Sequence, residues 1–503
     1  MDSHISKVKA LCEGYSISET LNKVSENGIC EECGNPNSFG DEWSTWCTPC
    51  NSRHFIDEFP SWTSGNHNVD ELIRQTQINT SHYESTFEWI PYEQFTDIKF
   101  ISRGGFGQVF KATWSGGPVL YWDRKKKRWF RWPRVPVALK VLYNSQNISS
   151  DFLSEITSHL KLYRNSNTCS EIVRCHGISQ DPKSKEYIMV LEYCARGDLG
   201  RYLVENFDNL TWSKCLDHLL DIARGLNTIH SEGLMHRDIH SGNLLIDVSY
   251  AAIGDLGLCR PADSSVSKNS IYGVMPYVAP ELLRGKPFTQ ASDIYSFGII
   301  MWELSSGFRP FPNIPHDLNL ALKICDGIRP AIIEGTPECY KELMQKCWHN
   351  DPNERPNIAN IVRKIEKWLN DILEGDDVWS KADRNRNTTR EVPKIKIHSE
   401  AVYNSRLLPM VNNELFVKRS MITYELIVKR SQESCNELIC NQSQASCDEF
   451  RVIKIVYKVL VSSGMYGMSD QPQPHYHHGS TMMINDIYDF SLIIIMLLGV
   501  VNV

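Results

Sequence analysis

The stretch from His236 to Leu245, which reads H-R-D-I-H-S-G-N-L-L, is the most specific part of this 503-residue chain. It lies inside a long segment, from about Tyr92 to Leu369, in which strand-like and helix-like patterns alternate. Such alternation requires a fold that contains both sheet and helices. A single Asp, His or Arg is more often a surface or structural residue, so the interpretation depends on what else this segment carries, and in which order.

A glycine-rich turn stands near the start of the same segment. Residues Ile101 to Phe110 read I-S-R-G-G-F-G-Q-V-F, with Gly104, Gly105 and Gly107 between two strand-like pieces. Glycine lets the backbone come close to phosphate oxygens, so that amide N–H groups can reach them. Glycine-rich turns also join many ordinary hairpins, and the phosphate interpretation therefore needs support from downstream residues.

A lysine supplies part of that support. The strand-like run Val137-Ala138-Leu139 ends in Lys140, and a helical segment from Asp151 to Leu162 follows. A lysine at the edge of a buried strand commonly extends its ammonium group to solvent. Glu155 on the helical segment can instead face inward and pair with Lys140. We expect such a pair to hold the ammonium group over the phosphates of ATP.

With the stretch H-R-D-I-H-S-G-N, these features resemble the eukaryotic protein kinase family, whose catalytic loop has His-Arg-Asp and an Asn five residues after the Asp. Asp255-Leu256-Gly257 and Ala279-Pro280-Glu281 follow at the expected distances. The stretch S-D-I-Y-S-F-G from Ser292 to Gly298, with Cys347-Trp348, is similar to the tyrosine-kinase-like group. The resemblance covers a little over half of the chain. It implies an α+β, bilobal fold, with an antiparallel N-lobe sheet and a helical C-lobe.

The resemblance also implies ATP and Mg²⁺ as cofactors and assigns roles to individual residues. Asp238 would accept the proton of the substrate hydroxyl, Asn243 and Asp255 would bind Mg²⁺, and Lys140 would pair with Glu155. The nucleotide would lie among residues of the glycine-rich turn, the neighbouring strands and the link between the lobes, namely Ile101, Gly104, Gly105, Gly107, Val109, Ala138, Lys140, Glu192, Cys194, Leu245 and Asp255.

Two positions of the catalytic loop bear on acceptor choice and regulation. His240 stands two residues after Asp238, where kinases for serine and threonine usually carry Lys and tyrosine kinases usually carry Ala, so it indicates neither acceptor. Arg237 corresponds to an arginine that pairs with a phosphate on the activation loop. That loop, from Leu258 to Tyr277, offers the hydroxyls of Ser264, Ser265, Ser267, Ser270 and Tyr272. We expect phosphorylation of one of them to order the loop.

Four cysteines near the N-terminus form two close pairs. Cys30 and Cys33, then Cys47 and Cys50, are each two residues apart, with thirteen residues between the pairs. Paired cysteines supply four thiolates to structural zinc, although this gap is slightly under the usual range. We favour a zinc-ribbon-like module with a structural or partner-binding role over free thiols.

A basic run separates the glycine-rich turn from Lys140. Seven of the eleven residues from Arg124 to Arg134 are Lys or Arg, interleaved with Trp129 and Trp132. Such a pattern can dock nucleic acid or an acidic lipid surface. Charge runs are commonly solvated, so we favour an extended, solvated hairpin between two strands. The net charge of −7 also argues against nucleic acid as a partner.

The rest of the chain adds little chemistry. No apolar signal sequence opens it, and its longest apolar run, Leu492 to Val501, has about half the length that a membrane-spanning helix needs. We therefore expect a cytoplasmic protein without a transmembrane span and, at most, C-terminal membrane contact. The expected segments are a polar N-terminus (1–29), the zinc module (30–54), a helical connector with apolar positions Val69, Leu72, Ile73 and Ile78 (55–91), the kinase domain (92–372), and a tail that is largely linker or disordered (373–503).

The sequence thus favours an ATP-dependent protein kinase that acts on protein hydroxyls, with Ser/Thr preferred, in signal transduction. Its partners would be protein substrates and signalling proteins. The alternative is a pseudokinase scaffold that binds ATP and partners without efficient catalysis. A metal-dependent nucleic-acid-binding protein is a third reading, based only on the basic run and the cysteines.

Overall fold

The structure is a computed structural model. It describes residues 28–40, 45–103, 107–143, 145–146, 150–165, 171–261, 271–388 and 396–411. All of these belong to the unit Met1–Val417, and the second unit, Lys418–Val503, lies outside the described residues, as does the apolar run Leu492 to Val501. None of the helices that the structure describes is both long and apolar enough to cross a membrane.

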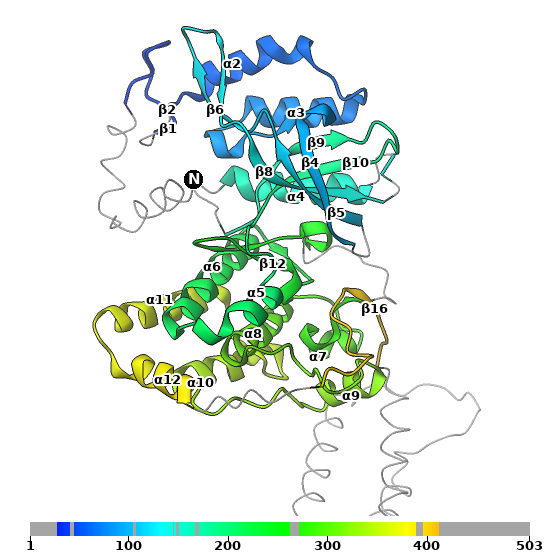
Figure 1. The fold of residues 1–503 in the computed structure, drawn as a ribbon, viewed down its shortest axis with the longest axis vertical. Coiled ribbons are helices and arrows are strands. Elements are labelled where there is room, and N and C mark those ends of the chain that lie inside the picture. Colours follow the sequence, from blue (N-terminus) through cyan, green and yellow to red (C-terminus); the bar gives the residue numbers. More distant parts are fainter. Residues whose placement is uncertain are drawn as a thin grey trace, which may run out of the picture. The chain divides into compact units, whose positions relative to one another are not determined.

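A six-stranded sheet forms the core of the N-lobe. Its neighbouring strands pair antiparallel, except for one parallel pair at the edge of the sheet. The outer strand of that pair precedes the kinase segment in the sequence. In spatial order the strands are β3 (Glu88–Trp89), β9 (Cys175–Gln180), β10 (Tyr187–Glu192), β8 (Val135–Leu142), β5 (Gly107–Trp114) and β4 (Phe95–Arg103). The sheet and the helical lobe below it confirm the predicted α+β bilobal class (Figure 1).

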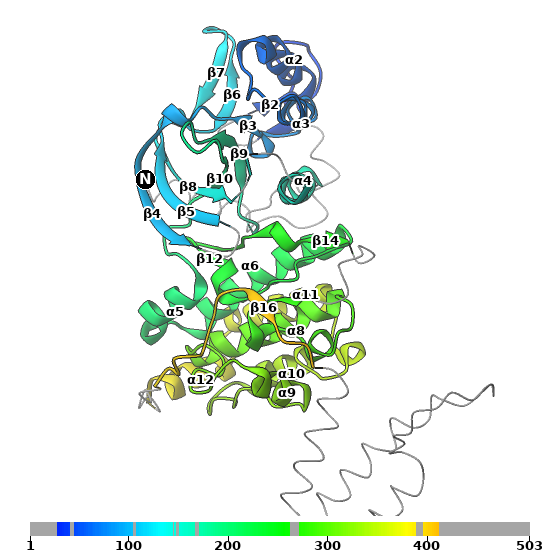
Figure 2. The ribbon, with the colours of Figure 1, turned by 90° about the vertical axis from the view of Figure 1, so that its right-hand side faces the viewer.

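Alternating side chains give this sheet two buried faces. In β10, Ile188 and Val190 pack into one apolar cluster, whereas Tyr187 and Met189 pack into another on the opposite side. This follows from the two-residue period of a strand. The second face is covered by two helices, α4 (Ser150–Asn165) and α3 (His67–Ile78), which Figure 2 shows on the same side of the sheet.

The segment expected to be a connector belongs to this lobe. Val69 and Ile73 of α3 are fully buried in one cluster with Ile156 of α4. The helix begins after Asn66, whose side chain accepts hydrogen bonds from the N–H groups of Asn68 and Val69. Strand β3 then pairs with β9. A boundary at residue 92 therefore removes a strand from the sheet, and 55–91 is more than a link between domains.

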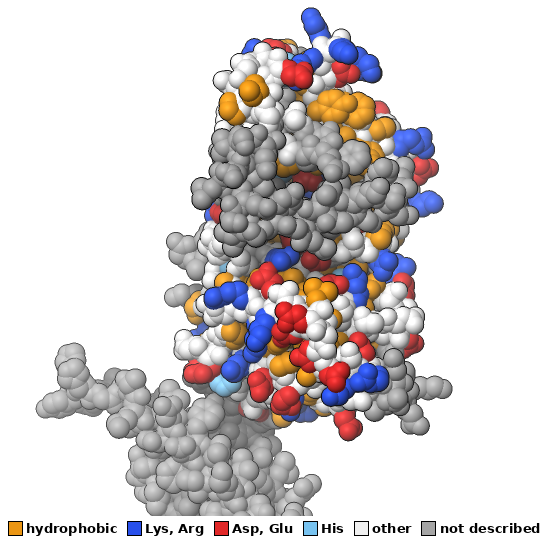
Figure 3. Space-filling model, turned by 90° about the vertical axis from the view of Figure 1, so that its left-hand side faces the viewer, with side chains coloured by type: hydrophobic (Ala, Val, Ile, Leu, Met, Phe, Trp, Pro, Cys, Tyr) orange, Lys and Arg blue, Asp and Glu red, His pale blue; other side chains and the backbone are white. Residues whose placement is uncertain are grey.

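The basic run forms the predicted hairpin but is not wholly solvated. Strands β6 (Val119–Asp123) and β7 (Arg128–Arg131) pair with each other, and basic side chains occupy the hairpin tip, at the upper end of Figure 3. Trp129 is only 7% exposed, because it packs on Phe55 with ring centroids 4.3 Å apart. Phe55 lies on α2 (Thr48–Glu58), which follows Cys47. The cysteine module therefore packs against one face of the hairpin.

The C-lobe is built around α8 (Gln290–Ser306) and α6 (Trp212–Ser231). Nearly every residue of α8 is buried, as expected of a helix that is apolar on all sides. Arg355 donates two hydrogen bonds to Glu281, at 2.7 and 2.8 Å, and both side chains are buried. The remaining helices are α5 (Leu199–Asn206), α7 (Pro280–Leu283), α9 (Leu318–Cys325), α10 (Glu338–Cys347) and α11 (Ile358–Leu373).

The first part of the tail is ordered against this lobe, so its interpretation as linker or disorder is wrong there. Helix α12 (Asp377–Thr388) buries Trp379 and Ala382 and lies beside Trp212, whose ring centroid is 5.8 Å from that of Trp379. Farther on, β16 (Arg406–Leu408) pairs with β15 (Ile271–Gly273). The apolar residues here are few and lack a regular period, but the buried ones, such as Trp379 and Leu408, pack into the C-lobe core.

Candidate active site

Lys140 joins the two lobes by ion pairs. Its Nζ lies 2.6 Å from Oε1 of Glu155 on α4 and 2.8 Å from Oδ1 of Asp255. Lys140 and Glu155 are 7% and 6% exposed. Lys140 stands opposite Val109 of β5 and Met189 of β10 in the central strand β8, which fixes the direction of its side chain. The structure therefore brings together three residues that lie far apart in the sequence.

These contacts determine the charges at the centre of the site. Burial alone would lower the pKa of Lys140, but the carboxylates of Asp255 and Glu155 outweigh it and raise that pKa. Burial opposes ionisation of Asp255 as well, yet the Lys140 ammonium lowers the Asp255 pKa to about 2. His159 is 2% exposed one turn after Glu155; burial and the Lys140 charge lower its pKa to about 3. The helix thus presents a neutral, buried imidazole there.

A buried aspartate supports the catalytic loop, which runs from β11 (Leu234–Met235) to β12 (Leu244–Ile246). The backbone N–H groups of His236 and Arg237 donate to the two oxygens of Asp293, each at 2.9 Å. Arg237 has φ of 71°, a left-handed conformation that costs energy in a residue other than glycine. The two charge-assisted hydrogen bonds that Asp293 accepts offset that cost.

Asp238 and Asn243 lie side by side in this loop. Nδ2 of Asn243 donates to the backbone carbonyl of Asp238 at 2.9 Å. The amide nitrogen is thereby engaged, and the amide oxygen is the atom suited to bind a hard cation. The residue after β13 (Ala251–Ile253) and Gly254 is Asp255, whose φ of 54° sets its carboxylate toward Lys140. The donor set of the Asp255 carboxylate and the Asn243 amide oxygen fits Mg²⁺.

His240 is buried beside Asp238. Its Nδ1 accepts a hydrogen bond from Gly242 N–H at 3.1 Å, so Nε2 carries the proton of the neutral ring. Nε2 faces Oδ2 of Asp238 at 3.7 Å, longer than a hydrogen bond. The Nε2–H group of His240 therefore lies beside the Asp238 carboxylate without a hydrogen bond to it.

The residues that we expect to surround the nucleotide lie along the strands and the link between the lobes. Val109, Ala138 and Leu245 are partly buried, Cys194 is buried, and Ile101 is 45% exposed. Glu192 accepts a hydrogen bond from Tyr250 Oη at 2.5 Å, and burial raises the pKa of Glu192.

Three glycines belong to the same group. A Cβ on Gly107 would lie 2.1 Å from the Val141 carbonyl, so this position accepts only glycine. Gly104 and Gly105 lie outside the described residues.

Sequence reasoning missed a network beneath the catalytic loop. Ser241 Oγ lies 3.1 Å from Tyr277 Oη, which donates to Glu303 Oε2 at 2.7 Å. Burial raises the pKa of Glu303 to about 7. In the sequence, the only sign of this network is Glu303, a charged residue within the apolar run that forms α8. Of the proposed phosphorylation sites, Tyr272 is 44% exposed on β15, and the four serines lie outside the described residues.

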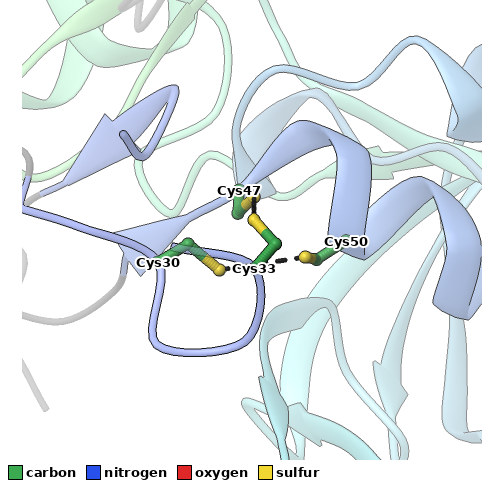
Figure 4. Close-up of side chains that lie close together, drawn as sticks. All are labelled: Cys30, Cys33, Cys47 and Cys50. Carbon is green, nitrogen blue, oxygen red and sulfur yellow. Dashed lines mark hydrogen bonds between the residues drawn. The ribbon is translucent and has the colours of Figure 1, made fainter. Parts of the chain in front are cut away.

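The four cysteines converge as their spacing predicts. Their sulfur atoms all lie within 4.8 Å of one another. Figure 4 shows the four side chains gathered at one place. The Cys30 and Cys50 sulfur atoms are 3.8 Å apart, and those of Cys33 and Cys47 are 3.6 Å apart. A tetrahedral zinc site with Zn–S bonds of about 2.3 Å has sulfur–sulfur edges of about 3.8 Å, so the donor set fits zinc.

Comparison with known proteins agrees with this geometry. A family model described as protein tyrosine and serine/threonine kinase matches residues 95–365. The chain is 30% identical to the probable serine/threonine-protein kinase drkD of Dictyostelium discoideum, over 58% of this chain and 21% of that protein. It is 30% identical to the serine/threonine-protein kinase VIK and 26% identical to the serine/threonine-protein kinase STY17, both of Arabidopsis thaliana. Those matches cover 57% and 65% of this chain and 62% and 53% of the relatives, so the chain spans less than two thirds of each.

Proposed function

Because the chain belongs to the protein tyrosine and serine/threonine kinase family, we propose that it transfers the γ-phosphate of ATP to hydroxyl groups of protein substrates. This membership confirms the resemblance inferred from the motifs. The names of the similar proteins favour serine and threonine as acceptors, and the C-lobe motifs favour the tyrosine-kinase-like group. We propose signalling in the cytoplasm as the setting, where thiols stay reduced and a four-cysteine site persists.

The observation that carries this proposal is the ion-paired triad of Lys140, Glu155 and Asp255. Phosphoryl transfer depends on positioning and on neutralising charge around the moving group. Glu155 fixes the ammonium of Lys140 at the entrance to the phosphate site, and the low pKa of Asp255 keeps a carboxylate available for Mg²⁺. When bound, Mg²⁺ neutralises charge on the phosphates; Asn243 and Asp255 would hold it. Asp238 would orient the acceptor hydroxyl and take its proton.

The decisive test compares the wild-type chain with Asp238→Asn in magnesium and labelled ATP, followed by identification of the phosphorylated residue type. We expect transfer to Ser or Thr that falls by about 10²-fold or more in the variant. Asp57→Asn, an exposed residue of α2, is the matched control and should keep full activity. ATP binding without transfer in the wild type would instead support the pseudokinase scaffold.

We also propose that the cysteine module holds a structural zinc ion. Burial raises the pKa of Cys47 and Cys50, whereas a hydrogen bond from the Asn35 backbone N–H lowers the Cys33 pKa to about 7. A divalent cation is what holds four thiolates together at such a place. We expect one zinc per chain by elemental analysis, lost in Cys47→Ser and kept in Cys339→Ser, whose thiol lies in the C-lobe helix α10. Equal zinc content in both variants would refute the assignment.

A further inference from the structure

Residues 396–411 follow the surface of the C-lobe as an extended strap. Figure 2 shows the strap, with β16 at its centre, crossing the face of that lobe. It is tied down along its length by hydrogen bonds to the loop before α9 and to the end of α7. These bonds join His398 N to Pro312 O (2.8 Å), His316 N to Glu400 O (3.0 Å), Tyr403 Oη to Pro310 O (3.0 Å), Arg406 Nη2 to His316 O (2.5 Å) and Val411 N to Leu283 O (2.8 Å).

At its centre the strap adds a strand to the activation segment. Residues Ile271, Tyr272 and Gly273 of β15 pair antiparallel with Leu408, Leu407 and Arg406. The two leucines face opposite ways, since Leu408 is 4% exposed and Leu407 is 56% exposed. Leu408 packs into the C-lobe core. The strap is therefore held by backbone pairing and by a buried side chain, as a docked peptide would be.

The paired edge of β15 lies next to the proposed base. A Cβ on Gly273 would be 3.7 Å from Oδ1 of Asp238, and Gly273 is the residue opposite Arg406. An acceptor hydroxyl on a protein must reach Asp238. An extended polypeptide that delivers it along the activation segment would bind this edge by strand addition, the usual way in which a peptide binds an open strand.

We propose that residues 403–411 occupy the edge of β15 on which protein acceptors dock. The strap then competes with protein substrates for the β15 edge of its own chain. This inference rests on the proposed kinase function. A tethered segment competes at an effective concentration on the order of millimolar, without any need for tight binding. The strap therefore lowers the fraction of chains that can accept a protein substrate and leaves the nucleotide site between the lobes unchanged.

Leu408→Asp in the full chain places a charge in the core position and should release the strap. Leu407→Asp makes the same change on the exposed face of the same strand and is the control. We expect Leu408→Asp to lower the KM for casein by about tenfold, with the KM for ATP unchanged, and Leu407→Asp to leave both constants at their wild-type values. Equal KM values for casein in a folded Leu408→Asp variant and wild type would overturn the proposal. Phosphate found on Ser405 of the wild-type chain would do the same, because the strap would then be a substrate.

Two further measurements keep the test valid if Leu408→Asp folds poorly or if no phosphate is transferred. Tyr403→Ala removes a partly buried ring that lies under the Arg309 guanidinium and meets the His316 ring edge to face, and it should also lower the KM for casein. A fluorescent peptide of residues 396–411 should bind to the Leu408→Asp chain and not to wild type, as measured by anisotropy. Peptide binding needs no catalysis, so it separates failure of the strap proposal from failure of the kinase proposal. Equal peptide binding to both chains would overturn the proposal that the strap covers the docking edge.

Discussion

Trp129 offers a direct test of whether the cysteine module is part of the N-lobe. Its ring stacks on Phe55 of α2, with centroids 4.3 Å apart, and on Trp46, with centroids 5.8 Å apart. A Trp side chain buries about 150–250 Å², which at about 25 cal/mol per Å² corresponds to about 4–6 kcal/mol as an upper bound. Measured Trp→Ala changes in cores cost about 3–5 kcal/mol. We therefore expect Trp129→Ala to lower the free energy of unfolding by about 4 kcal/mol.

The assay is urea unfolding followed by far-UV circular dichroism, with zinc release measured in parallel. Trp132→Ala is the matched control, because Trp132 follows the same hairpin and is 41% exposed. The control should change the free energy of unfolding by less than about 0.5 kcal/mol. If the two variants unfold at the same urea concentration, the hairpin does not bind the cysteine module, and our account of this face is refuted.

Two other predictions concern the active site. Glu155→Gln keeps the size of the side chain but removes the charge opposite Lys140, and we expect kcat/KM for ATP to fall by about 10²-fold while the exposed Glu205→Gln keeps the wild-type value; equal values would refute the role of the pair. Burial raises the pKa of Glu303 from 4.5 to about 7, so the folded state holds this proton more tightly than the unfolded state. Stability from Glu303 is present below pH 4.5 and falls by about 3 kcal/mol as the pH rises to 7. Urea titrations at both pH values should show this fall in wild type and lose it in Glu303→Gln; an unchanged difference would refute the assignment.

The motifs predicted the site because phosphoryl transfer restricts the residue types. Lys140, Glu155 and Asp255 meet as the resemblance implies, and Asn243 lies beside Asp238. The sequence could not indicate what Glu303 does beneath the loop. Its partner is a tyrosine hydroxyl that is brought close only by folding. Nor did His240 indicate its orientation, which depends on one hydrogen bond from Gly242.

By itself the sequence determined the kinase fold, the pairing of Lys140 with Glu155 and the convergence of four cysteines, since each follows from local spacing and residue chemistry. Tertiary structure alone decided that α3 and the hairpin join the module to the N-lobe, and that residues 396–411 pair with the activation segment. Those associations depend on a few buried side chains, such as Val69, Trp129 and Leu408. Contacts of this kind join segments far apart in the chain and leave no periodic pattern in either partner, because the complementary surface exists only once the rest has folded.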